Sequence, residues 1–153
     1  MIKNFFLADD DPDDLELFDE ALRGIDSAIE FNYANNGKEV IKKIQLDGMV
    51  PQVIFLDINM PEMNGWECLE SLKKVDQLKE IPVIMYSTSS SEVYGKRAIS
   101  SGALAFYVKP PSFLLLQDFL KSIAGSSSIY LKQTLVELQL SKTHTVYTDQ
   151  ENS

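Results

Sequence analysis

The chain has 153 residues, of which 44% are hydrophobic and 24% charged, and its formal net charge is −9. That length and composition are typical of one soluble globular domain with a short appendage, whereas the negative charge argues against non-specific nucleic-acid binding and against anionic membrane surfaces. The only cysteine, Cys68, excludes an internal disulfide, and the only histidine, His144, excludes histidine metal clusters and Ser-His-Asp or Cys-His catalysis.

Short apolar runs alternate with amphipathic segments five times along the chain, which predicts a βα repeat with a parallel sheet. Apolar runs of this length between polar flanks are typical of strands buried on both faces. In chain order, the sequence predicts a strand at 3–8, a helix at 12–25, a strand at 30–34, a helix at 37–46, a strand at 53–57, a helix at 66–75, a strand at 83–86, a helix at 91–101, a strand at 105–108 and a helix at 112–124.

Cap and turn residues set the limits of several of these elements. Asp11 is a good cap and Pro12 is accepted in a first helical turn, so the first helix begins there. Asp13 and Asp14 follow in that turn, and we interpret both, with Asp11, as acids that complement the helix dipole rather than as metal ligands.

A run of glycine and serine after residue 124 marks a break in composition. We therefore place one domain at residues 1–125 and a C-terminal extension at 126–153. Three leucines at helical spacing, beginning with Leu131, predict a short helix in the extension. From Lys142 onward the chain is polar, and we expect it to be disordered.

Three acids directly follow two of the predicted strands. Asp9 and Asp10 come after the first apolar run, and Asp57 ends the third. In open α/β sheets, ligands bind just beyond the carboxyl ends of the strands, so neighbouring strands would bring these carboxylates together. Carboxylates this close together raise one another's pKa unless a cation lies between them. A cluster with only oxygen ligands suits Mg²⁺ or Mn²⁺.

Two further polar side chains reach the same rim. Ser87 follows the fourth predicted strand, and Lys109 follows the fifth, immediately before Pro110. Carboxylates, a hydroxyl and an ammonium around a divalent ion form a constellation suited to phosphoryl transfer. A carboxylate can itself be the nucleophile in such chemistry and form an aspartyl-phosphate.

These motifs resemble the receiver domain of the two-component response-regulator family, a chemotaxis-regulator-like superfamily, in its small single-domain type. The resemblance covers about residues 2–124. It implies a flavodoxin-like, doubly wound α/β fold with a five-stranded parallel sheet, strand order 2-1-3-4-5, and five helices. The motifs occupy residues 7–11, 55–65, 87–88 and 107–110.

The resemblance also implies a role for each matching position. Asp57 would accept phosphate from a histidine kinase or a phosphotransfer protein. Asp10 and Asp57, with the backbone carbonyl of Asn59, would coordinate Mg²⁺ or Mn²⁺, and Asp9 would assist through a water molecule.

Other matching positions imply a switch. Lys109 would pair with the phosphoryl group across a cis bond to Pro110, and Ser87 would move to bond the phosphate. Thr88 and Ser89 are alternative sources of this hydroxyl. Phe106 occupies the place of an aromatic residue that follows this movement in many receivers. It lacks the hydroxyl often found there.

The function implied is a phosphorylation-dependent signalling switch with slow self-hydrolysis and no turnover of small substrates. The segment after residue 124 is too short for a DNA-binding or catalytic output domain, so we expect output through another protein or a homodimer. The resemblance places that contact on the face formed by the fourth helix, fifth strand and fifth helix. No apolar run approaches the roughly 18 residues of a membrane span, and we expect a cytoplasmic protein without nucleic-acid or membrane partners.

Three alternatives remain at this point. A Mg²⁺-dependent phosphatase of the haloacid dehalogenase type also phosphorylates an aspartate after a strand, although Asn59 stands where its motif has a second acid. A degenerate receiver would bind partners without phosphorylation. A flavodoxin-like FMN-binding protein would share the sheet order but would not need three acids beside an anionic phosphate.

Overall fold

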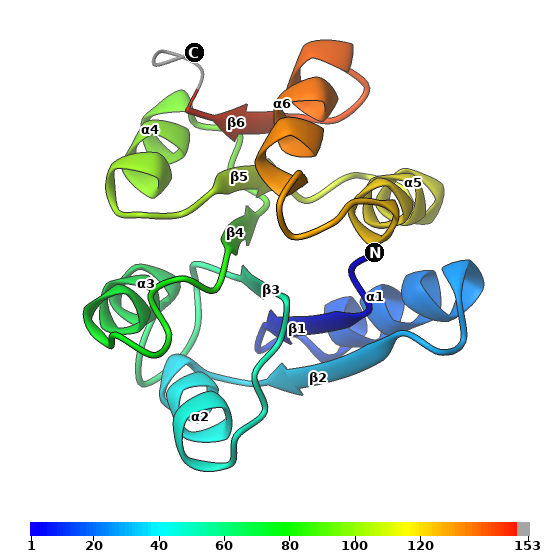
Figure 1. The fold of residues 1–153 in the computed structure, drawn as a ribbon. Helices are drawn as coiled ribbons and strands as arrows, with labels where there is room; N and C mark the ends of the chain where they lie inside the picture. The colour runs from blue at the N-terminus through cyan, green and yellow to red at the C-terminus, as the bar shows by residue number, and fades with distance from the viewer. Residues whose placement is uncertain (150–153) are drawn as a thin grey trace.

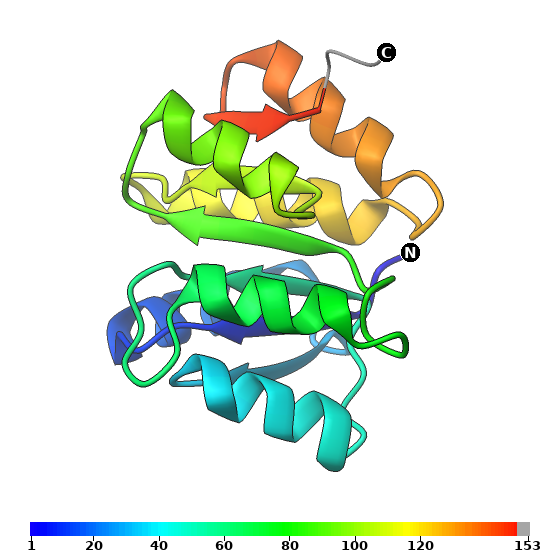
Figure 2. The ribbon, with the colours of Figure 1, turned by 90° about the vertical axis from the view of Figure 1, so that its left-hand side faces the viewer.

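The computed structural model describes residues 1–149, and within them six strands form one sheet with helices on both faces (Figures 1 and 2). In chain order the elements are β1 (Asn4–Ala8), α1 (Pro12–Ile25), β2 (Glu30–Ala34), α2 (Gly37–Ile41), a π-helix (Lys42–Leu46), β3 (Val53–Leu56), α3 (Gly65–Lys74), β4 (Val83–Ser87), α4 (Glu92–Ser100), β5 (Ala105–Val108), α5 (Phe113–Gly125), α6 (Leu131–Ser141) and β6 (Val146–Thr148). The strand order is β2-β1-β3-β4-β5-β6, with β6 antiparallel to β5. The predicted α/β class is confirmed, and β6 extends the predicted sheet.

The central strands are buried on both faces, as their unbroken apolar runs predict. Every residue of β3 and β4 is buried, and in β1 only Asn4 keeps partial exposure. One face of the sheet packs against α1 and α5 through side chains such as Phe18 and Phe119, and the other packs against α2, α3 and α4 (Figure 1). Because both faces are filled, the ends of the strands are the part of the sheet open to a ligand.

Side-chain caps fix where the helices next to these strand ends begin. The Asp11 carboxylate accepts a 2.9 Å hydrogen bond from the Asp13 amide at the start of α1. Asn64 and Glu67 form a reciprocal capping box at the start of α3, with bonds of 2.9 and 3.2 Å. Within residues 1–149, none of the helices combines the length and apolar character that a membrane crossing requires.

The C-terminal extension is more ordered than the sequence predicts. The leucine spacing correctly predicts a helix, and Leu131 and Leu135 of α6 are buried. Disorder from Lys142 onward is wrong for residues 142–149, which turn at Lys142 with φ of 61° and form β6. β6 forms because it pairs with the otherwise unpaired edge of β5. The prediction used only the local polar composition, which carries no information about pairing with a distant strand. Residues 150–153, also predicted to be disordered, lie outside the described residues.

Candidate functional site

The ends of β1 and β3 lie side by side and bring three acids together. The two strands pair in parallel with Ala8 opposite Leu56, and the Asp57 amide donates a 2.9 Å hydrogen bond to the Ala8 carbonyl. Carboxylate oxygens of Asp9, Asp10 and Asp57 all lie within 4.8 Å of one another. Asp9 and Asp57 are buried, whereas Asp10 is exposed. The structure therefore assembles the acid cluster that the strand ends predict.

Lys109, directly after β5, reaches into this cluster. Its Nζ lies 2.8 Å from Asp9 Oδ2, 2.8 Å from Asp14 Oδ2 and 3.7 Å from Asp57 Oδ2. The side chain is only 10% exposed, and Nζ also lies 5.1 Å from the centroid of the Tyr86 ring. The lysine therefore holds three carboxylates from two strands and a helix around a single buried positive charge.

The peptide bond between Lys109 and Pro110 is trans, which corrects the cis bond implied by the family resemblance. The Lys109 amide donates a 2.7 Å hydrogen bond to the Ser87 carbonyl, so the end of β5 stays attached to β4. This hydrogen bond fixes the Lys109 backbone, and the lysine side chain reaches the acids although the peptide bond to Pro110 is trans.

Burial and charge shift the pKa values of these groups in a consistent way. Burial raises the pKa of Asp57 to about 7, Lys109 opposes the shift and Asp9 adds to it. Burial also raises the pKa of Asp9, against its hydrogen bond with Lys109. For Lys109, burial alone would lower the pKa, but hydrogen bonds with Asp14 and Asp9 raise it above its ordinary value. The site therefore holds more negative charge than one ammonium can offset, which favours the binding of a further cation.

Ser87 lies at the rim but is engaged with its own loop. It is the last residue of β4, is 3% exposed, and stands opposite Val108 of β5. Its hydroxyl oxygen accepts a 3.3 Å hydrogen bond from the Ser89 amide. The structure thus places Ser87 beside the backbone of the lysine strand, with its hydroxyl committed to the loop that leads into α4.

The loop after Asp57 is held close to the start of α3. The Gly65 amide donates a 2.9 Å hydrogen bond to the Ile58 carbonyl, and a Cβ added at Gly65 would lie 2.2 Å from the Asp57 carbonyl oxygen. Glycine is therefore required for this close approach. Asn59 lies in the exposed part of the same loop, two residues after Asp57.

Phe106 does not lie in the acid cluster. Its ring is fully buried on the face of the sheet covered by α2, α3 and α4, and it makes an edge contact with Tyr147 of β6 at 6.0 Å between ring centroids. The structure thus connects this predicted switch position with the C-terminal strand.

Two rim residues were not predicted as parts of the site. Asp14 hydrogen-bonds Lys109, although the sequence supports its reading as a simple helix N-terminal acid. The only available signal is that the first turn of α1 begins directly beyond the β1 rim, so an acid there can face the cluster. Tyr86 has no such signal, because its apolar run predicts only a buried strand residue.

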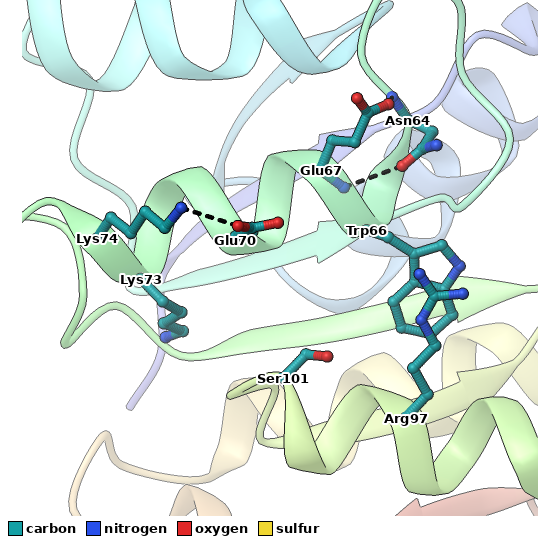
Figure 3. A pocket seen from close by; sticks show the side chains of 8 residues that line it. All are labelled: Asn64, Trp66, Glu67, Glu70, Lys73, Lys74, Arg97 and Ser101. Atoms are coloured by element: carbon teal, nitrogen blue, oxygen red, sulfur yellow. Dashed lines mark hydrogen bonds and ion pairs between the residues drawn. The ribbon is translucent and has the colours of Figure 1, made fainter.

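A separate hollow lies between α3 and α4 and shares no residue with the acid cluster (Figure 3). The Arg97 guanidinium lies over the Trp66 ring, 4.3 Å from its centroid, and Lys74 pairs with Glu70 at 2.8 Å. Because the basic and acidic side chains of this hollow are already paired with neighbours, it presents no single charge sign to a ligand.

The sequence and the fold are similar to those of known proteins. The family model for the response regulator receiver domain matches residues 5–121, so α6 and β6 lie beyond the matched region. The two-component response regulator ORR3 of Oryza sativa subsp. japonica is 37% identical over 76 residues, which are 50% of this chain and only 57% of the rice protein. Chemotaxis protein CheY1 of Helicobacter pylori (strain J99) is 30% identical over 94 residues, which are 61% of this chain and 75% of that protein.

Solved structures lead to the same family. The phosphorylated cyanobacterial phytochrome response regulator RcpA has 27% sequence identity and a TM-score of 0.73, with 80% of this chain and 91% of that chain covered. The chemotaxis response regulator CheY4 of Vibrio cholerae has 26% identity and a TM-score of 0.68, with 79% and 98% covered. The chain therefore belongs to the response regulator receiver domain family.

Proposed function

We propose that this receiver domain is a phosphorylation switch of two-component signalling, with Asp57 as the phosphoacceptor. The observation that supports the proposal most directly is the grouping of Asp9, Asp10 and Asp57 around one rim, with the Lys109 ammonium 3.7 Å from Asp57. Receiver domains are in general not turnover enzymes, and here too the chemistry is limited to accepting a phosphoryl group and losing it slowly to water.

The reaction is a transfer between two side chains. A carboxylate oxygen of Asp57 attacks the phosphorus of a phosphohistidine on a histidine kinase or phosphotransfer protein. An O–P bond forms and the P–N bond breaks, and the electron pair stays on the imidazole nitrogen, which takes up a proton. Self-hydrolysis reverses the state of Asp57 when water attacks the phosphorus and the carboxylate leaves.

The donor set of the rim fits a divalent cation. The side-chain donors are all oxygens, they lie within 4.8 Å of one another, and their charge exceeds that of the one nearby ammonium. Asp10 and Asp57 would hold Mg²⁺ or Mn²⁺ with the Asn59 carbonyl, and Asp9 would assist through water. When bound, the ion offsets the negative charge on the carboxylates and on the transferring phosphoryl oxygens.

The remaining residues sense the new charge. A phosphoryl group adds roughly −1.5 to −2 charge. Lys109 exchanges part of its contact with Asp9 and Asp14 for the phosphoryl oxygens, and the Ser87 hydroxyl leaves the Ser89 amide to donate to the phosphoryl group. Movement of this loop shifts the domain between two packings of α4 on β5, and the Phe106 side chain on the α4 side of β5 takes part in this change.

The test is intact-mass measurement of the full chain after incubation with acetyl phosphate and Mg²⁺. We expect the mass of one added phosphoryl group on the wild type and on Asp76→Asn, which changes an acid 94% exposed at its side chain. We expect none on Asp57→Asn. Continuous hydrolysis of small phosphate esters would favour the phosphatase alternative, and no label on the wild type would favour the degenerate receiver. A histidine kinase is the expected physiological donor and a cytoplasmic protein the expected target.

A further inference from the structure

The C-terminal segment at 126–148 occupies the side of the domain on which the family resemblance places partner contacts (Figures 1 and 2). β6 lies along the edge of β5 and contacts α4, and α6 packs against α5. Leu131, Leu135 and Val146 are buried in the same apolar cluster as Phe119 of α5. The face is therefore covered, in this state, by the chain's own residues.

One side chain of β6 joins three elements. Tyr147 stands opposite Phe106 in the strand register, and the two rings make an edge contact at 6.0 Å between centroids. The tyrosine ring also lies on the backbone of α4, since a Cβ added at Gly95 would be 2.5 Å from Tyr147 Cγ. The hydroxyl donates a 2.9 Å hydrogen bond to the Ser90 carbonyl in the loop before α4. The hydroxyl that Phe106 lacks is thus supplied by its neighbour across the strand pair.

The loop between β4 and α4 connects this tyrosine to the acid rim. The Ser89 amide donates to the Ser87 hydroxyl and the Ser91 amide donates to the Ser89 hydroxyl, both at 3.3 Å. Both distances exceed the usual range for such bonds, so these contacts restrain the loop weakly. Among the side-chain hydrogen bonds of the loop between Ser87 and Ser91, the bond from Tyr147 to Ser90 is the shortest, so it restrains the middle of the loop.

We propose that β6 is a latch, and that phosphorylation of Asp57 releases it through Tyr147. This inference rests on the proposed function. When Ser87 leaves Ser89 for the phosphoryl group, the Ser90 carbonyl moves with the loop and its bond to the tyrosine hydroxyl breaks. A strand of three residues, Val146–Thr148, holds few backbone bonds of its own, so this loss shifts the population toward an undocked β6. The edge of β5 and the side of α4 then become accessible to a partner that competes with β6.

Amide hydrogen exchange on the full chain tests the release. The Val108 amide donates to the Thr145 carbonyl at 3.0 Å, so its exchange reports whether the segment around β6 is docked. With acetyl phosphate and Mg²⁺, we expect exchange at Val108 and in β6 to accelerate by about two- to tenfold, the effect of one lost hydrogen bond. Asp57→Asn is expected to show no change. A mass gain of one phosphoryl group without faster exchange would overturn the latch alone, whereas no mass gain would overturn the proposed function and the latch together.

Glycine substitutions on two helices give a matched comparison without phosphorylation. Gly95→Ala favours the helix by intrinsic propensity but places a Cβ against the Tyr147 ring, so we expect β6 exchange to rise roughly tenfold or more. Gly125→Ala is the control, because nothing lies within 4 Å of its added Cβ. Equal exchange in the two variants would show that the contact between Tyr147 and α4 does not hold β6 in place, and would overturn the latch.

Tyr147→Phe keeps the ring and removes only the hydroxyl, so it is expected to fold. If the bond from the tyrosine hydroxyl favours the unphosphorylated conformation, its loss must strengthen the binding of a phosphoryl analogue, by the factor by which the bond disfavours the phosphorylated conformation. We expect Tyr147→Phe to bind beryllium trifluoride with Mg²⁺ about two- to tenfold more tightly than the wild type. Unchanged affinity would show that Tyr147 is only a packing residue and would overturn its coupling role.

Discussion

The acid rim at the strand ends is made of charged groups, whereas the C-terminal face, where α6 and β6 cover α5 and β5, is made mostly of apolar groups. At the rim, carboxyl groups from two strands and a helix share one ammonium, and burial raises the pKa of Asp57 and Asp9. At the C-terminal face, apolar and aromatic side chains fill the space between strand and helices. There the Tyr107 and Phe119 rings stack with centroids 3.6 Å apart, and His144 is buried against both. The comparison indicates that the C-terminal face contributes stability, whereas the buried and uncompensated negative charge of the rim costs stability.

The largest expected effect is at the C-terminal face. Leu135 is fully buried in the cluster that joins α6 to the sheet, so Leu135→Ala should lower the free energy of unfolding by about 2–5 kcal/mol. Urea unfolding of the full chain measures this. Leu140→Ala on the same helix is the control, because Leu140 is 64% exposed and should change stability by less than about 0.5 kcal/mol. Equal losses in the two variants would show that α6 does not belong to the core.

At the rim, we expect a substitution to raise the free energy of unfolding rather than to lower it. Folding raises the pKa of Asp57 from 3.8 to about 7, so the native state holds this proton more tightly than the unfolded state. Stability therefore falls as the pH rises from about 4 to about 7, and Asp57→Asn removes that loss. In EDTA at pH 8, we expect Asp57→Asn to be more stable than the wild type by roughly 4 kcal/mol, at about 1.4 kcal/mol for each pKa unit. At pH 4 the difference should vanish. A variant that is less stable than the wild type at pH 8 would contradict the raised pKa of Asp57.

The smallest expected effect concerns α3, which follows the loop after Asp57. Asn64→Ala removes the cap of α3 and should cost about 1 kcal/mol in thermal or urea unfolding. Because Asn64 closes the loop that carries Asn59, the same variant should also bind Mn²⁺ more weakly than the wild type. Ser112→Ala, which removes the cap of α5, is the matched control. It should cost a similar amount of stability and leave Mn²⁺ binding unchanged.

The sequence predicts the central sheet well because a strand buried on both faces requires an unbroken apolar run, as in β3 and β4. It also predicts the acid cluster, since adjacent parallel strands end at the same rim. The role of Asp14 could not be predicted, because an acid in a first helical turn satisfies the helix dipole equally well without a lysine beside it.

β6 could not be predicted for a different reason. Its three residues are followed by polar chain and become a strand only because the edge of β5 is free to pair. The burial of His144 and the placement of Tyr147 against Gly95 depend on that pairing and on α4, which are distant in sequence. The acid cluster could therefore be predicted from local motifs, whereas the docking of β6 required the three-dimensional structure.

The most direct test of the rim is its dependence on a divalent cation. Phosphorylation by acetyl phosphate, followed by intact mass, should occur with Mg²⁺ and be abolished when EDTA removes the metal. Asp10→Asn should lose most of the label at the same Mg²⁺ concentration, while the exposed-acid control Asp76→Asn should label like the wild type. Labelling of the wild type to the same extent in EDTA would contradict the account.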